Sequence, residues 1–158
     1  MAKALSMDRP RLRDIAHAGA RGVVAAMSMT GVRAVTGGLD IVEEIPPQKL
    51  FRQLTPRLLG RVPKRKRDAA IEVGHWAYGG VGGAGYALLP GNLRARPWAG
   101  PCYGLVIWLG FELGISPVLR LLGPQTPRRA RDRVALAADH ALYGLVLSEI
   151  RPAHKEMR

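Results

Sequence analysis

Acidic and histidine side chains lie inside the most apolar stretches of this 158-residue chain. Histidine titrates near neutral pH, and burial raises the pKa of a carboxyl group towards the same range. Such a group can pass protons, hold a cation or respond to acid. The same groups can instead hydrogen-bond one another and hold helices together, and the sequence leaves both roles open. The candidate polar seam consists of Arg33, Glu72, His75, Glu112, Asp139 and His140.

Four stretches of apolar and small residues carry these groups, at residues 14–35, 69–89, 98–122 and 134–150. Each is close to the roughly 20 residues that a helix needs to cross a bilayer. Ionisable groups at that depth usually face the interior of a helix bundle. We therefore expect an all-α polytopic membrane protein with about four transmembrane helices. Residues 14–150 would form this domain, between a basic lead-in at 1–13 and a tail at 151–158.

Overall composition is less typical of a membrane protein. The hydrophobic fraction of 47% is ordinary for a globular chain, and the mean hydropathy of −0.01 is low for a membrane protein. The apolar residues are nevertheless concentrated in blocks, and most of the 24 Lys and Arg residues lie between the blocks. The formal net charge of +12 indicates an acidic partner, either anionic lipid or nucleic acid.

Basic residues flank the second and fourth apolar stretches. Beside a membrane span, such residues bind anionic headgroups and set the orientation of the helices. The residues expected to contact headgroups are Lys64, Arg65, Lys66, Arg67, Arg128, Arg129 and Arg131. Because residues 36–68 and 120–133 together hold more Lys and Arg than the remaining connections and ends, we expect both termini outside the cytoplasm. The expected location is the bacterial inner membrane, as a multi-pass protein.

The connection between the first two stretches contains its own helical pattern. Leu50, Phe51, Leu54 and Leu58 recur at helical spacing, with basic residues between them. This pattern is typical of a short helix lying on the membrane surface, and equally of a helix packed on a protein core.

Glycines at a spacing of four favour close packing of helices. Gly79 and Gly83 form one such pair, and Gly110 and Gly114 form another. We expect these two faces to serve in a homo-oligomer or in a larger membrane complex.

Signals for enzymatic chemistry are missing. The histidines do not occur at helical metal-ligand spacing, and there is no HExxH motif. No serine lies in a GxSxG context, and the glycine-rich run lacks the form of a nucleotide-binding loop. We therefore expect a non-enzymatic protein without a metal or cofactor.

Residues 22–48 resemble the first-helix motif of the YagU-like bacterial inner-membrane proteins. Arg33 matches the internal basic position, Glu43 or Glu44 the following acid, and Pro46-Pro47 the diproline. Gln48 replaces the family's arginine, and Glu112 stands where the family has a histidine. The later stretches are similar as far as residue 145. The resemblance implies an integral inner-membrane protein of poorly defined activity, linked to acid tolerance, and it supplies no catalytic residues.

Three functions follow as hypotheses. The first is proton or cation handling, or acid-stress tolerance, through the polar seam. The second is a structural or assembly subunit of a larger membrane complex. The third is a soluble basic protein that binds nucleic acid, which the membrane interpretation does not favour.

Overall fold

Residues 10–37, 60–115, 117 and 130–149 are described by a computed structural model. Most of these residues are helical, and this part of the chain contains no strand. The prediction of an all-α protein is confirmed for these residues.

Four longer helices form the framework: α1 (Leu12–Gly37), α4 (Arg67–Ala87), α6 (Ala99–Gly110) and α8 (Ala130–Glu149). Shorter elements are η1 (Lys64–Lys66), α5 (Gly91–Arg94) and η2 (Phe111–Ile115), of which η2 is a π-helical turn. The longer helices begin and end close to the limits of the four apolar stretches in the sequence, except that α6 is much shorter than 98–122.

Prolines explain the start and the end of α6. Pro101 lies in its first turn, where the backbone N–H groups have no partner within the helix, so a proline is tolerated there. Pro117 lacks the N–H that would bond to the Leu113 carbonyl. The α-helix accordingly ends at Gly110 and continues as the π-helical turn η2 just before this proline.

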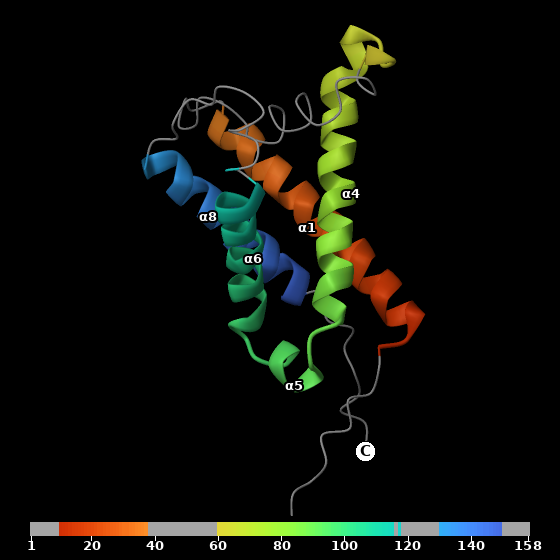
Figure 1. Cartoon of the computed structure of the whole chain (residues 1–158), viewed down its shortest axis with the longest axis vertical. Helices are drawn as coiled ribbons and strands as arrows, with labels where there is room; N and C mark the ends of the chain where they lie inside the picture. Colours follow the sequence, from red (N-terminus) through yellow and green to blue (C-terminus); the bar gives the residue numbers. More distant parts are fainter. Residues whose placement is uncertain (1–9, 38–59, 116, 118–129, 150–158) are drawn as a thin grey trace, which may run out of the picture.

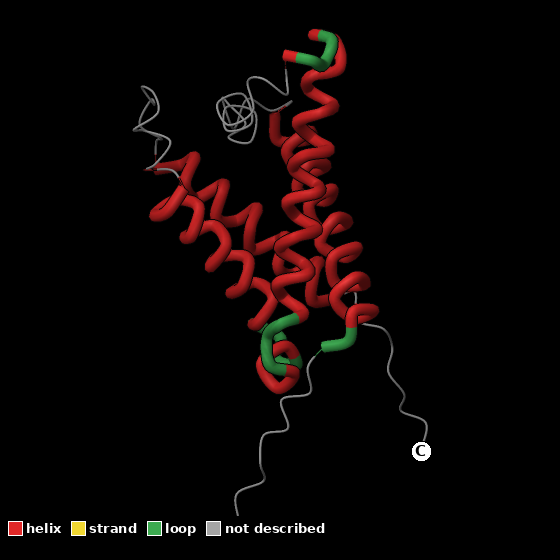
Figure 2. The backbone as a smooth tube through the Cα atoms, turned by 45° about the vertical axis from the view of Figure 1, so that its right-hand side comes forward, coloured by secondary structure: helices red, strands yellow, loops and turns green. Residues whose placement is uncertain are grey.

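The helices pack as two crossing pairs. Helix α1 packs against α4, α6 packs against α8, and α1 and α8 also contact each other. Figure 1 shows α4 and α6 standing upright while α1 and α8 cross them obliquely. The tube view of Figure 2 shows the short α5 in the connection that joins one pair to the other. The contact between α1 and α8 therefore joins the two pairs at the centre of the fold.

Glycines permit both crossings. A Cβ atom on Gly83 would collide with the carbonyl oxygen of Ala18 and the backbone of Gly22, both on α1. Between α6 and α8, a Cβ atom on Gly104 would collide with the carbonyl of His140. A Cβ atom on Gly100 would collide with the carbonyl oxygen of Gly144, and one on Gly144 with the carbonyl oxygen of Gly100. The predicted close packing at Gly79 and Gly83 is confirmed as an approach of α1 in the same chain, whereas no described atom lies within 4 Å of a Cβ at Gly110 or Gly114. The use of either glycine face in a homo-oligomer or a larger complex stays a prediction.

Small and aromatic side chains fill the core. The main cluster consists of Ala25, Ala26, Met29, Tyr86, Tyr143 and Leu147. Two tyrosine hydroxyls tie other helices to α4, because Tyr143 donates to the Gly79 carbonyl at 2.6 Å and Tyr103 donates to the Gly82 carbonyl at 2.7 Å. The Tyr103 ring also meets Tyr86 edge to face, with centroids 5.1 Å apart.

The prediction of transmembrane helices is wrong for the described part of the chain. None of the helices there combines the length and the apolar character that crossing a bilayer requires. Helix α6 has no charged residue, but its 12 residues extend only about 18 Å against a hydrocarbon core of about 30 Å. The longer helices carry charges within them, such as Arg21 and Arg33 in α1 and Asp139 in α8, and much of α4 is glycine.

The polytopic membrane fold and the multi-pass inner-membrane location are therefore both corrected, and the predicted orientation of the termini is withdrawn with them. The predicted surface helix at Leu50–Leu58 lies outside the described residues. The same is true of Arg128, Arg129 and the family-like motif residues Glu43, Glu44, Pro46 and Pro47.

Candidate functional site

An ion pair joins the two crossing helices at the centre of the fold. The Nε of Arg33 on α1 donates to Oδ2 of Asp139 on α8 at 2.6 Å. Both side chains are largely buried, with 12% and 14% of their surfaces exposed. The sequence singled out both residues, and the structure brings them together across 106 positions of the chain.

A threonine links α1 to α4 beside this ion pair. The hydroxyl of Thr30 lies 3.0 Å from Oε2 of Glu72 and donates to it, and it accepts a hydrogen bond of 3.2 Å from the indole nitrogen of Trp76. Thr30 was missed in the sequence. Its position one helical turn before Arg33 places it on the same side of α1, which was the available signal.

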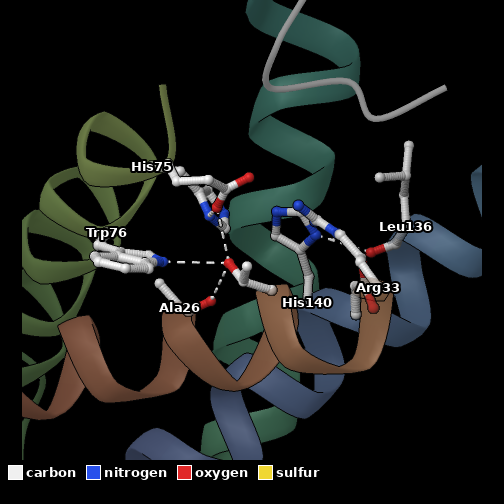
Figure 3. Close-up of polar contacts among 9 residues, drawn as sticks. Ala26, Arg33, His75, Trp76, Leu136 and His140 are labelled. Carbon is white, nitrogen blue, oxygen red and sulfur yellow. Dashed lines mark hydrogen bonds and ion pairs between the residues drawn. The ribbon is translucent and has the colours of Figure 1, made fainter. Parts of the chain in front are cut away.

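Two histidines complete the site. His75 on α4 is 8% exposed, and its Nδ1 lies 3.9 Å from Oε2 of Glu72, too far for a hydrogen bond. This nitrogen is buried and has no hydrogen-bond partner among the described residues. His140 on α8 donates from Nδ1 to the Leu136 carbonyl at 2.8 Å in one tautomer. Figure 3 shows both imidazoles directed into the same region where the three helices meet.

Burial and positive charge hold both imidazoles in the neutral form. Desolvation is the largest cause for His75, and the charges of Arg33 and His140 add to it, so its pKa falls from 6.5 to about 4. Desolvation also lowers the pKa of His140, with Arg33 lowering it further, although the Leu136 carbonyl and Asp139 act in the opposite direction. Both imidazoles are therefore uncharged at neutral pH.

These contacts define a polar junction of α1, α4 and α8. Its members are Thr30, Arg33, Glu72, His75, Trp76, Asp139 and His140. Glu112 on η2, the remaining residue of the predicted seam, pairs with Arg133 of α8 at 3.4 Å. The sequence did not single out Arg133 as its partner. Nearby in the chain, the indole nitrogen of Trp108 is buried without a hydrogen bond in this part of the structure.

The junction offers little for metal or covalent chemistry. Within the described ranges, no three His, Cys, Asp or Glu residues gather closely enough to hold a metal ion. What the arrangement can do is bind and release protons at two buried imidazoles that lie next to a fixed positive charge.

Basic side chains gather at the start of α4. Lys64, Arg65 and Lys66 are exposed in η1, while the Nε of Arg67 donates to the Val62 carbonyl at 3.1 Å. Arg131 is exposed at the start of α8, where it pairs with Asp132 at 3.7 Å. The contact of these residues with anionic headgroups stays a prediction.

Large apolar side chains lie on the outside of every longer helix. Within the described residues, more of them are exposed than buried. On α6 and η2, four exposed residues repeat at spacings of four, three and four, which places them on one helical face. We call this face the α6 stripe: Cys102, Val106, Leu109 and Leu113. Val106 is 62% exposed and Leu113 is 73% exposed.

Comparison with known proteins found no match for this chain among protein-family models, curated proteins or solved structures. The resemblance to the YagU-like family stays a prediction.

Proposed function

We propose that this chain is a structural subunit of a larger protein assembly, in which neighbouring polypeptides cover the apolar outer faces of its helices. A folded chain that works alone rarely exposes contiguous apolar patches larger than a few hundred Å². The observation that supports the proposal is the α6 stripe, which is uninterrupted by any polar or charged side chain.

The shape of this face suits another helix. Residues at spacings of four and three form the row that an α-helix presents to a packed neighbour. Gly110 and Gly114 lie beside the stripe, and no atom of the described residues comes within 4 Å of a Cβ at either, so the absence of a side chain allows a neighbouring backbone to approach closely. Similar exposed residues on other helices, such as Val35 on α1 and Val81 on α4, extend the apolar exterior.

The state of assembly tests the proposal directly. We expect full-length protein in detergent-free buffer, and the protein in extracts of the cells that make it, to sediment well above its 17.1 kDa monomer mass. Replacing Val106 and Leu109 by lysine together should reduce the mass, because burying two ammonium groups in an apolar interface is unfavourable.

A matched control adds the same charge elsewhere. Ala69 and Ala130 are exposed at the basic ends of α4 and α8, and their replacement by lysine should leave the assembly intact. A single monomeric species in both the purified protein and the extract would refute the proposal. So would an assembly that is unchanged by lysines in the α6 stripe.

Two other hypotheses stay predictions. Proton or cation handling, or acid-stress tolerance, has the two buried imidazoles of the polar junction in its favour. Nucleic-acid binding has the exposed basic side chains of η1 in its favour. It does not account for the uncharged outer faces, since nucleic-acid interfaces are polar and strongly basic.

A further inference from the structure

The polar junction joins α1 both to α4 and to α8. Arg33 bonds α1 to α8 through Asp139, and Thr30 bonds α1 to α4 through Glu72 and Trp76. The two histidines lie between these ties, one on α4 and one on α8 (Figure 3). Burial of a histidine between helices needs its neutral form, because a buried charge without a close counter-charge is costly.

We propose that the polar junction is an acid-sensitive latch, in which proton binding at His75 and His140 releases the ties among α1, α4 and α8. This inference does not depend on the proposed assembly. It concerns how the helices of a single chain are held together.

The charged groups around the histidines explain why protons would release the latch. The ionisable groups near His75 are Glu72 on its own helix, Arg33 on α1 and His140 on α8. Asp139 is already engaged by Arg33, and Glu72 is engaged by Thr30. The additional pair of Glu112 and Arg133 joins η2 to α8. A proton on either imidazole therefore adds positive charge next to Arg33, and the carboxylate of Asp139 is already paired with that guanidinium.

Glu72 makes the effect specific to the tie between α1 and α4. A protonated His75 becomes a donor at Nδ1, and the acceptor beside it is Oε2 of Glu72 at 3.9 Å. The same oxygen accepts the hydrogen bond from Thr30. If His75 draws Glu72 closer, the hydrogen bond between Thr30 and Glu72 breaks, and the Thr30 hydroxyl keeps only the Ala26 carbonyl of its own helix, 3.3 Å away. If His75 instead moves towards water, it leaves its buried position on α4 beside Glu72. Both movements loosen the junction.

The direction of the pH effect follows from proton linkage. Because the fold lowers the pKa of His75 from 6.5 to about 4, the unfolded chain binds more protons than the folded chain between these values. The stability due to a neutral His75 is present above pH 6.5 and is lost as the pH falls towards 4. The lowered pKa of His140 acts in the same direction.

The first measurement is an NMR titration of the imidazoles in the full-length protein. We expect His75 to titrate near pH 4 and His140 to titrate below its ordinary pKa of 6.5. Titration of either junction histidine at or above pH 6.5 would overturn the proposal.

The second measurement is the unfolding equilibrium in urea at pH 7.5 and pH 5. We expect His75 alone to raise the unfolding constant roughly 30-fold between these pH values. The double variant His75→Gln/His140→Gln keeps neutral side chains that can form hydrogen bonds and should remove this increase, whereas His17→Gln should retain it. An increase of the same size in the double variant would overturn the proposal.

A local readout separates the latch from a general loss of stability. In a protein with Trp98→Phe and Trp108→Phe, fluorescence reports Trp76, which belongs to the junction. We expect its emission to shift as the pH falls from 7 through 4, while the far-ultraviolet circular dichroism still shows folded helices. A shift that coincides with global unfolding, or one that persists when both histidines are glutamine, would contradict the latch. If the double variant fails to fold, the single variant His140→Gln and the titration of the unaltered protein still test whether protonation of the two histidines opens the junction.

Discussion

The ion pair between Arg33 and Asp139 should be a main tie between the two helix pairs. Changing Asp139 to Leu removes the carboxylate that accepts the hydrogen bond from Nε of Arg33. Breaking one side of a buried pair costs roughly 3–5 kcal/mol. Since each side chain keeps a little exposed surface, at 12% and 14%, we expect the lower end of that range, about 3 kcal/mol of unfolding free energy. Arg33→Met should cost a similar amount.

The double variant tests the reasoning more strictly. Arg33→Met combined with Asp139→Leu replaces both charges by apolar side chains, which is often close to neutral for a buried pair. We expect its stability to be within about 1 kcal/mol of the original protein, so the two single effects should not add. Urea unfolding at pH 7.5, followed by circular dichroism, gives the three free energies by linear extrapolation.

The exposed pair of Arg131 and Asp132 is the matched control. Its atoms lie 3.7 Å apart, and the Arg131 side chain is 51% exposed, so Arg131→Met should change stability by less than about 1 kcal/mol. A coupling energy below about 0.5 kcal/mol between Arg33 and Asp139 would refute the claim that this pair ties α1 to α8. The claim would also be refuted if the single variants at Arg33 and Asp139 lost no more unfolding free energy than Arg131→Met.

Two further predictions concern the packing of α4. Gly83→Ala should destabilise the fold by about 1–3 kcal/mol, because the added methyl meets the backbone of α1, whereas Gly110→Ala should be neutral or stabilising in the same urea assay. Equal effects at the two glycines would contradict the close approach of α1 and α4. Tyr143→Phe should cost about 1 kcal/mol through loss of the bond to the Gly79 carbonyl, and an unchanged thermal midpoint would show that this bond contributes nothing.

Much of the helical framework could be read from the sequence. The apolar stretches and the Pro and Gly residues between them marked where the longer helices lie, because turns and helix ends depend on local chemistry. The participation of Glu72, His75, Asp139 and His140 in one polar region was also anticipated from their positions inside apolar helices.

The prediction of membrane-spanning helices is wrong because the length of an apolar stretch does not give the length of its helix. The α-helix α6 ends at Gly110, well before residue 122, where the apolar stretch ends. Glycine and alanine, which fill much of α4, permit close packing but contribute little hydrophobicity. The mean hydropathy of −0.01 for the whole chain agrees with this low hydrophobicity.

The helical class, the approximate helix limits and the residue types available for proton chemistry follow from the order of the amino acids. The pairs of partners do not: Arg33 meets Asp139, Thr30 meets Glu72 and Glu112 meets Arg133 because of the way the helices cross. The crossing of the helices also places Gly79 and Gly83 against α1 of the same chain, while Gly110 and Gly114 have no close neighbour among the described residues. The physical reason is that helix formation depends on neighbours within a few residues. Pairing across 106 positions depends on how the helices cross, and that is set by packing over the whole fold.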